Sequence, residues 1–254
     1  MQKTIITRYE EETLKITVSS PYDISLRLIV KDADKENTVF TDRNREFSGT
    51  FIFYVRMPLC GNKTDIMLFD ESNPEDDSTF TLVSIERMPL EKRMDLIDLR
   101  NFQLRSFIKF AQKFAFNAGW IRTNDPNNEN DYYHSDDGQF FIKYLPNIVD
   151  QNGNIEPTPS RIESGSGIIE VSQNDFIGFT VPMRMAILTH EFSHVYLNVN
   201  PNDETEADLN GLLIYLALGY PRIEAHEAWI DTFENAPTDG NMERYQIMEQ
   251  FISD

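Results

Sequence analysis

Residues 180–215, TVPMRMAILTHEFSHVYLNVNPNDETEADLNGLLIY, contain the pattern from which the fold of the chain can be inferred. Within them, His190, Glu191 and His194 form an H-E-x-x-H motif. On a helix, residues four apart lie on one face, so both imidazoles can reach a single tetrahedral Zn²⁺ at roughly 2.0–2.1 Å. Glu191 lies beside the ion rather than on it, where a carboxylate can accept a proton from a zinc-bound water.

The segment around this motif is predicted to be a buried helix. Thr180 suits the N-cap and Pro182 the first turn. Apolar residues recur at three-four spacing away from the histidines, at Met185, Leu188, Phe192, Val195 and Val199. The face of His190 and His194 is also apolar, with Met183, Ala186, Ile187 and Leu197. Buried histidines need partners. A metal ion supplies them, and two histidines satisfied by hydrogen bonds within the core are the alternative.

Acidic residues at the start of the next predicted helix offer a third ligand. Glu204 and Asp208 are four apart and share a face, whereas Glu206 points elsewhere. H-E-x-x-H followed by E-x-E-A-D resembles the glutamate-zincin metallopeptidases of the HtpX and ImmA types. The resemblance implies that Glu204 is the third zinc ligand and that Asp208 orients a ligand histidine. The spacer after His194 is shorter than in those families, so Glu206 and Asp208 stay open as alternatives for the third ligand.

A second, weaker resemblance covers about half of the chain. The segments HEFSHVYLN and ETEADLNGLLIYLALGYPR are similar to proteins of crAss-like tailed phages. That resemblance implies a neck or tail ring protein of a virion, in which a zincin fold need not cut anything. The two functions to be weighed are therefore a zinc metallopeptidase and a structural virion component.

Composition and charge restrict the partners. The chain has 42 acidic and 23 basic residues, a formal net charge of −19, which disfavours contact with nucleic acid. The single Cys60 excludes an internal disulfide framework and fits a reducing compartment. The first residues lack a signal-peptide core, and the longest apolar run, 212–217, is too short to insert into a membrane. We expect a cytoplasmic or virion protein.

Residues 1–92 are predicted to form an all-β domain. Short alternating runs with turn-forming clusters between them, and no helix, are typical of an antiparallel β-sandwich. The predicted strands are 13–18, 24–30, 50–55, 65–69 and 80–85. No catalytic constellation is visible among them. We therefore expect a docking domain that contacts protein partners in a larger assembly, as a homo-oligomer.

Residues 93–254 are predicted to form a zincin-like α+β domain. A long amphipathic helix ends before Gly119, and an Asn/Asp-rich loop covers 123–138. The loop contains Asp131, His134, Asp136 and Asp137, but their spacing favours a solvated loop over a metal site. The strand 168–171 resembles the zincin edge strand that pairs with substrate, and an ordinary internal strand is the alternative. Helices at 221–235, with His226, and 242–252 complete the domain.

Overall fold

A computed structural model describes residues 1–98, 100–128, 130–235 and 238–253. The chain is divided into two compact units. One comprises Met1–Glu91 with Gly219–Pro221, and the other comprises Lys92–Leu218 with Arg222–Asp254. Helices and antiparallel strand pairs are both present, so the α+β class is confirmed. No helix in the described part of the chain is both long and apolar enough to cross a lipid bilayer.

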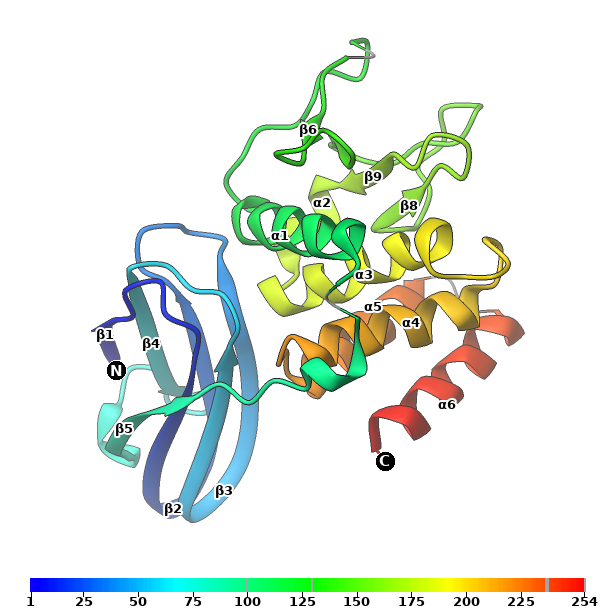
Figure 1. Ribbon diagram of the computed structural model, residues 1–254. Helices are drawn as coiled ribbons and strands as arrows, with labels where there is room; N and C mark the ends of the chain where they lie inside the picture. Colours follow the sequence, from blue (N-terminus) through cyan, green and yellow to red (C-terminus); the bar gives the residue numbers. More distant parts are fainter. Residues whose placement is uncertain (99, 129, 236–237, 254) are drawn as a thin grey trace. The chain divides into compact units, whose positions relative to one another are not determined.

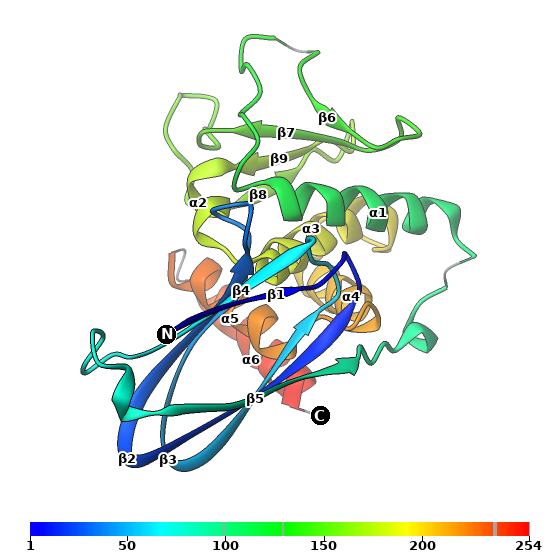
Figure 2. The ribbon, with the colours of Figure 1, turned by 90° about the vertical axis from the view of Figure 1, so that its left-hand side faces the viewer.

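The first unit is a single antiparallel sheet (Figures 1 and 2). Its strands are β1 (Gln2–Ile6), β2 (Glu12–Asp32), β3 (Val39–Met57), β4 (Lys63–Asp70) and β5 (Thr81–Pro89), and a 3₁₀ turn, η1 (Asp77–Thr79), precedes β5. The strand order is β1-β4-β2-β3, and β5 also pairs with β2. The long β2 is central, because its first half pairs with β5, its second half pairs with β4, and β3 follows both halves.

The continuity of β2 corrects the predicted sandwich. The sequence indicated separate strands at 13–18 and 24–30, but they form one strand with a register shift between Ser20 and Ile24. Pro21 lies in this irregularity, where its missing N–H interrupts no regular ladder hydrogen bond. All five strands therefore belong to one hydrogen-bonded sheet, and a bulge in β2 replaces the expected gap between two sheets.

Alternation along β2 supplies the core of the first unit. Along each half of β2, every second side chain points to the same face and is fully buried: Leu14, Ile16 and Val18 in the first half, and Leu26, Leu28 and Val30 in the second. The period of two is that of a strand with one buried face. Cys60 is also buried in this unit.

The second unit combines helices with a small sheet. Its helices are η2 (Met94–Leu96), α1 (Phe102–Asn117), α2 (Gln173–Gly178), α3 (Val181–Tyr196), α4 (Glu204–Ala217), α5 (Arg222–Asn235) and α6 (Asp239–Ser253). Its strands are β6 (Tyr133–His134), β7 (Phe141–Leu145), β8 (Ser160–Ile162) and β9 (Ile169–Ser172). Helices α1, α4 and α5 and strand β8 all pack against α3, which is the central helix of this unit (Figure 1).

The small sheet has the order β6-β7-β9-β8. Strand β9, at the position proposed for a zincin edge strand, is internal, because it pairs with β7 on one side and β8 on the other. Of the two alternatives for 168–171, the internal strand is therefore the one observed, and β6 and β8 are the edges of the sheet. Three residues after Pro157 and Pro159 are too few to show a strand period, which is why the sequence did not reveal β8.

Helix α3 begins as predicted. The Thr180 hydroxyl accepts a hydrogen bond from the Met183 amide at 3.3 Å, and Pro182 is in the first turn. The Phe192 ring stacks on Phe107 with ring centroids 4.2 Å apart. The predicted series of apolar residues from Met185 to Val199 does not extend to its last member. Val199 is 93% exposed, because the helix ends at Tyr196.

Arg184 is a feature of α3 that the apolar pattern did not indicate. Its side chain is fully buried. Its Nε donates to the Phe176 carbonyl at 2.6 Å and its Nη1 to the Ala115 carbonyl at 3.0 Å. These carbonyls lie in the last turns of α2 and α1, where helices have unpaired acceptors. Burial lowers the pKa of Arg184 to about 10, so the guanidinium stays charged at neutral pH.

Candidate metal centre

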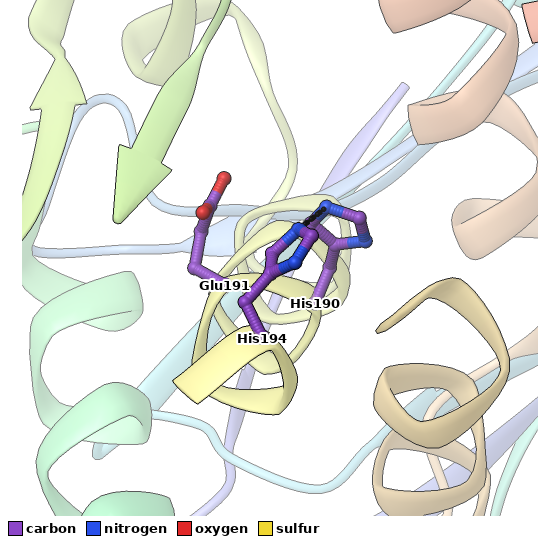
Figure 3. Close-up of side chains that lie close together, drawn as sticks. All are labelled: His190, Glu191 and His194. Carbon is purple, nitrogen blue, oxygen red and sulfur yellow. Dashed lines mark hydrogen bonds between the residues drawn. The ribbon is translucent and has the colours of Figure 1, made fainter. Parts of the chain in front are cut away.

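Two imidazoles face each other on α3. His190 and His194 lie one turn apart, and their Nε2 atoms are 3.0 Å apart (Figure 3). Their rings meet edge to face, with centroids 4.6 Å apart. The helical spacing inferred from the H-E-x-x-H motif is thus present, and both nitrogens point to a common position.

Helix α4 brings Glu204 to the same position. Its Oε2 lies 3.5 Å from Nε2 of His190, and its Oε1 lies 3.6 Å from Nε2 of His194. The approach depends on Gly211, since a Cβ there would be 2.8 Å from the His190 backbone nitrogen. A helix without a side chain at this crossing can pack backbone to backbone. Gly211 therefore allows α4 to place its acidic first turn against the histidines of α3.

The structure separates the three acids between which the sequence left the third ligand open. Glu204 contacts both imidazoles. The Glu206 carboxylate instead accepts hydrogen bonds from the Val199 amide at 3.1 and 3.2 Å, and so holds the turn between α3 and α4. Asp208 lies on the far side of His190, with its Oδ1 2.9 Å from Nδ1.

Asp208 is fully buried at the centre of a polar network. Arg244 donates to both of its oxygens, from Nε at 2.8 Å and from Nη2 at 3.0 Å, and Trp229 Nε1 donates at 3.0 Å. Arg244 also lies 3.1 Å from Oε2 of Glu204. Burial raises the pKa of Asp208, but the neighbouring His190 imidazole and Arg244 guanidinium outweigh this effect and lower the pKa to about 2. Helices α5 and α6 therefore support the site through Trp229 and Arg244.

The outer nitrogens of both imidazoles face acceptors. His194 Nδ1 is 2.8 Å from the Pro201 carbonyl, which requires a proton on Nδ1. His190 Nδ1 contacts Asp208 as an ion pair rather than as an aligned hydrogen bond. Each neutral imidazole then directs an Nε2 lone pair inward. Burial lowers the pKa of His190, but Asp208 and Glu204 outweigh it and raise the pKa to about 10. Without a metal ion, a proton on His190 satisfies the converging groups.

The separations fit a tetrahedral ion. Ligand atoms bound at roughly 2.0–2.1 Å in tetrahedral geometry lie about 3.3 Å apart. The Nε2 atoms of His190 and His194 are 3.0 Å apart, and each lies near a different oxygen of the Glu204 carboxylate, at 3.5 Å from Oε2 and 3.6 Å from Oε1 respectively. Among the described residues, one group of three or more His, Cys, Asp or Glu side chains has all its ligand atoms within 4.8 Å of one another; it consists of His190, Glu191 and His194 and does not include Glu204. Nitrogen and carboxylate ligands of this kind suit zinc.

Glu191 lies beside the histidines, within a cleft. Figure 3 shows its carboxylate next to the two imidazoles. Its Oε1 accepts a hydrogen bond from Ser160 Oγ of β8 at 2.6 Å. The cleft has a volume of about 540 Å³ and is lined by both histidines, Glu191 and Glu204, together with β8 and the residues that precede it.

Other candidate residues are engaged elsewhere. His226 lies 3.0 Å from the Tyr245 hydroxyl and does not line the cleft. In the Asn/Asp-rich loop, Asp131 pairs with Arg122 at 2.9 Å and Asp136 with Lys109 at 2.5 Å. These exposed ion pairs are consistent with a solvated loop rather than with a metal site.

Sequence reasoning missed Ser160, Trp229 and Arg244. Each lies in a different element from its carboxylate partner, and no local spacing connects them. Comparisons of the chain with protein-family models, with curated proteins and with solved structures found no match.

Proposed function

We propose that the chain is a zinc metallopeptidase in which His190, His194 and Glu204 hold the ion and Glu191 is the general base. The observation that carries the proposal is that the two imidazole Nε2 atoms and the Glu204 carboxylate lie together beside the buried Glu191 carboxylate in an open cleft. The resemblance of the motif to glutamate-zincins supports the same assignment.

The protein groups divide the reaction between them. When bound, zinc supplies a Lewis acid that polarises the scissile carbonyl and lowers the pKa of a water. Glu191 accepts the proton of the attacking water and delivers it to the leaving nitrogen. Asp208 and the Pro201 carbonyl hold the ligand imidazoles in orientation through their Nδ1 atoms. Arg244 offsets the negative charge that Glu204 and Asp208 bring to the site.

The edge strand defines where a substrate lies. Among the described strands, β8 pairs only with β9, so its other edge is open beside the cleft. An extended peptide can add to such an edge through main-chain hydrogen bonds. We infer an extended polypeptide as the substrate, bound along β8 with its scissile bond over the α3 histidines.

Glu191→Gln tests the function. Gln keeps the size of the side chain but cannot accept a proton near neutral pH, so cleavage of a peptide library should fall at least about 10²-fold. Bound zinc, measured by elemental analysis, and the melting temperature should stay near those of the wild type. Loss of zinc in this variant would show that the ligand assignment is wrong.

A chain that binds zinc but cleaves no peptide would exclude the enzyme. The structural role in a virion, implied by the weaker resemblance, would then take its place, with the zinc site as a stabilising element. In that case Glu191→Gln should leave assembly and infectivity unchanged.

A further inference from the structure

A serine of the edge strand holds the carboxylate of Glu191. Ser160 Oγ donates to Oε1 of Glu191 at 2.6 Å, the short distance typical of a hydroxyl bound to an ionised carboxylate. The two residues are 4% and 6% exposed, so little water competes for either oxygen. No other hydrogen bond to the Glu191 side chain is recorded among the described residues. Ser160 therefore restricts the rotation of this carboxylate from outside α3.

Strand β8 fixes the hydroxyl in place. Successive side chains of a strand point to opposite faces, so Ser160 points toward Glu191 while Arg161 points away. On that outer face, Arg161 pairs with Glu170 of β9 at 2.7 Å and with Glu156 at 2.6 Å. Ser160 itself lies opposite Val171 in the β8–β9 register. The hydroxyl is thus attached to a strand that is held on its far side by two ion pairs.

We propose that Ser160 is a positioning residue for Glu191 and that it couples the base to the strand along which the substrate lies. With Oε1 occupied by the hydroxyl, Oε2 is left as the oxygen that takes the proton. Because β8 carries both the serine and the open edge, a peptide added to that edge is placed in a fixed relation to the base. The proposal rests on the peptidase function above, but the pairing of the two side chains can be tested separately.

The kinetic test compares Ser160, which lines the cleft, with Ser166, which follows β8 and does not line it. Ser160→Ala should lower kcat about 10- to 100-fold, because a base displaced by a fraction of an ångström loses its alignment, while KM changes less than about twofold. Ser160→Thr retains the hydroxyl and should recover most of kcat. Ser166→Ala, an exposed control outside the cleft, should change neither constant. A Ser160→Ala enzyme with unchanged kcat, or with the loss confined to KM, overturns the proposal.

A second readout needs neither metal nor activity. In chelator-treated protein, Ser160→Ala should lower the melting temperature by a few degrees in the wild-type background and by much less in Glu191→Ala, since the hydroxyl has then lost its acceptor. Equal shifts in both backgrounds would mean that Ser160 only packs, which overturns the proposal. If the melting-temperature shift of Ser160→Ala depends on Glu191 but the wild-type protein cleaves no peptide, the peptidase function is refuted while the pairing of Ser160 with Glu191 stands.

Discussion

Replacing Asp208 by Asn removes one charge from the network behind His190 while keeping the shape of the side chain. The carboxylate is fully buried and accepts hydrogen bonds from Arg244 at 2.8 and 3.0 Å and from Trp229 at 3.0 Å. Asn offers one acceptor oxygen and no charge. Arg244 would therefore lose a fully buried anionic partner, and His190 would lose the carboxylate that fixes its orientation.

The size of the effect follows from this burial. Breaking a buried ion pair from one side costs about 3–5 kcal/mol. For a unit of this length each kcal/mol corresponds to about 2–4 °C, so the metal-free variant should melt about 10 °C below the wild type. Loss of a group that orients a ligand histidine weakens metal binding about 10- to 100-fold. The melting difference should therefore widen by a few degrees further when zinc is present in excess over both dissociation constants.

Thermal melts monitored by circular dichroism, with and without a chelator, measure the loss of stability in the metal-free and zinc-bound proteins. Competition with a chromophoric zinc chelator gives the zinc affinity. Asp203→Asn is the matched control, because Asp203 caps α4 by accepting from the Glu206 amide at 2.9 Å. Asn is as good an N-cap as Asp, so the control should melt with the wild type. A metal-free Asp208→Asn protein that melts like the control would refute the buried network as described.

Three further outcomes are expected. Glu204→Gln should weaken zinc binding by more than about 100-fold in chelator competition. Glu206→Gln, on the same helix turn, should leave the zinc affinity unchanged. If Glu206→Gln weakens binding and Glu204→Gln does not, Glu206 is the third ligand. Arg184→Met should lower the unfolding free energy by about 3–5 kcal/mol in urea titrations, because buried carbonyls at two helix ends lose their donor; an unchanged midpoint would contradict this. Burial raises the pKa of Cys60 from 9.0 to about 11, so the native thiol should resist iodoacetamide at pH 8 while the unfolded chain reacts. Since the unfolded state loses this proton first, the contribution to stability should fall as the pH rises from about 9 toward 11.

The helix that carries the candidate ligands could be predicted because its signals are local. Thr180, Pro182 and the apolar stripe lie within one segment, and each depends on neighbours a few residues away. The helical period alone predicts that His190 and His194 lie on the same face of the helix. The same applies to the alternation of β2, although a register shift that keeps one strand continuous leaves no mark in the pattern.

Residues that meet across elements could not be predicted in this way. Ser160 reaches Glu191 across 31 positions, and Arg244 reaches Asp208 across 36. The crossing of α3 and α4 at Gly211 determines which acid faces the histidines. This close approach leaves no periodic pattern in the sequence, so it could not be predicted. The family resemblance implied Glu204 for this place, and the contact distances are the independent reason to prefer it.

The pairing of β1 with β4 has a consequence for synthesis on the ribosome. Gln2 pairs with Met67, so β1 must wait for about 65 more residues before its partner exists. At about 5–20 residues per second, that delay is roughly 3–13 s, and the ribosomal tunnel lengthens it. During this time the β2–β3 hairpin presents an unpaired apolar strand to its surroundings. A chaperone that binds nascent chains would therefore find its target in the first 60 residues, well before the histidines of α3 are made.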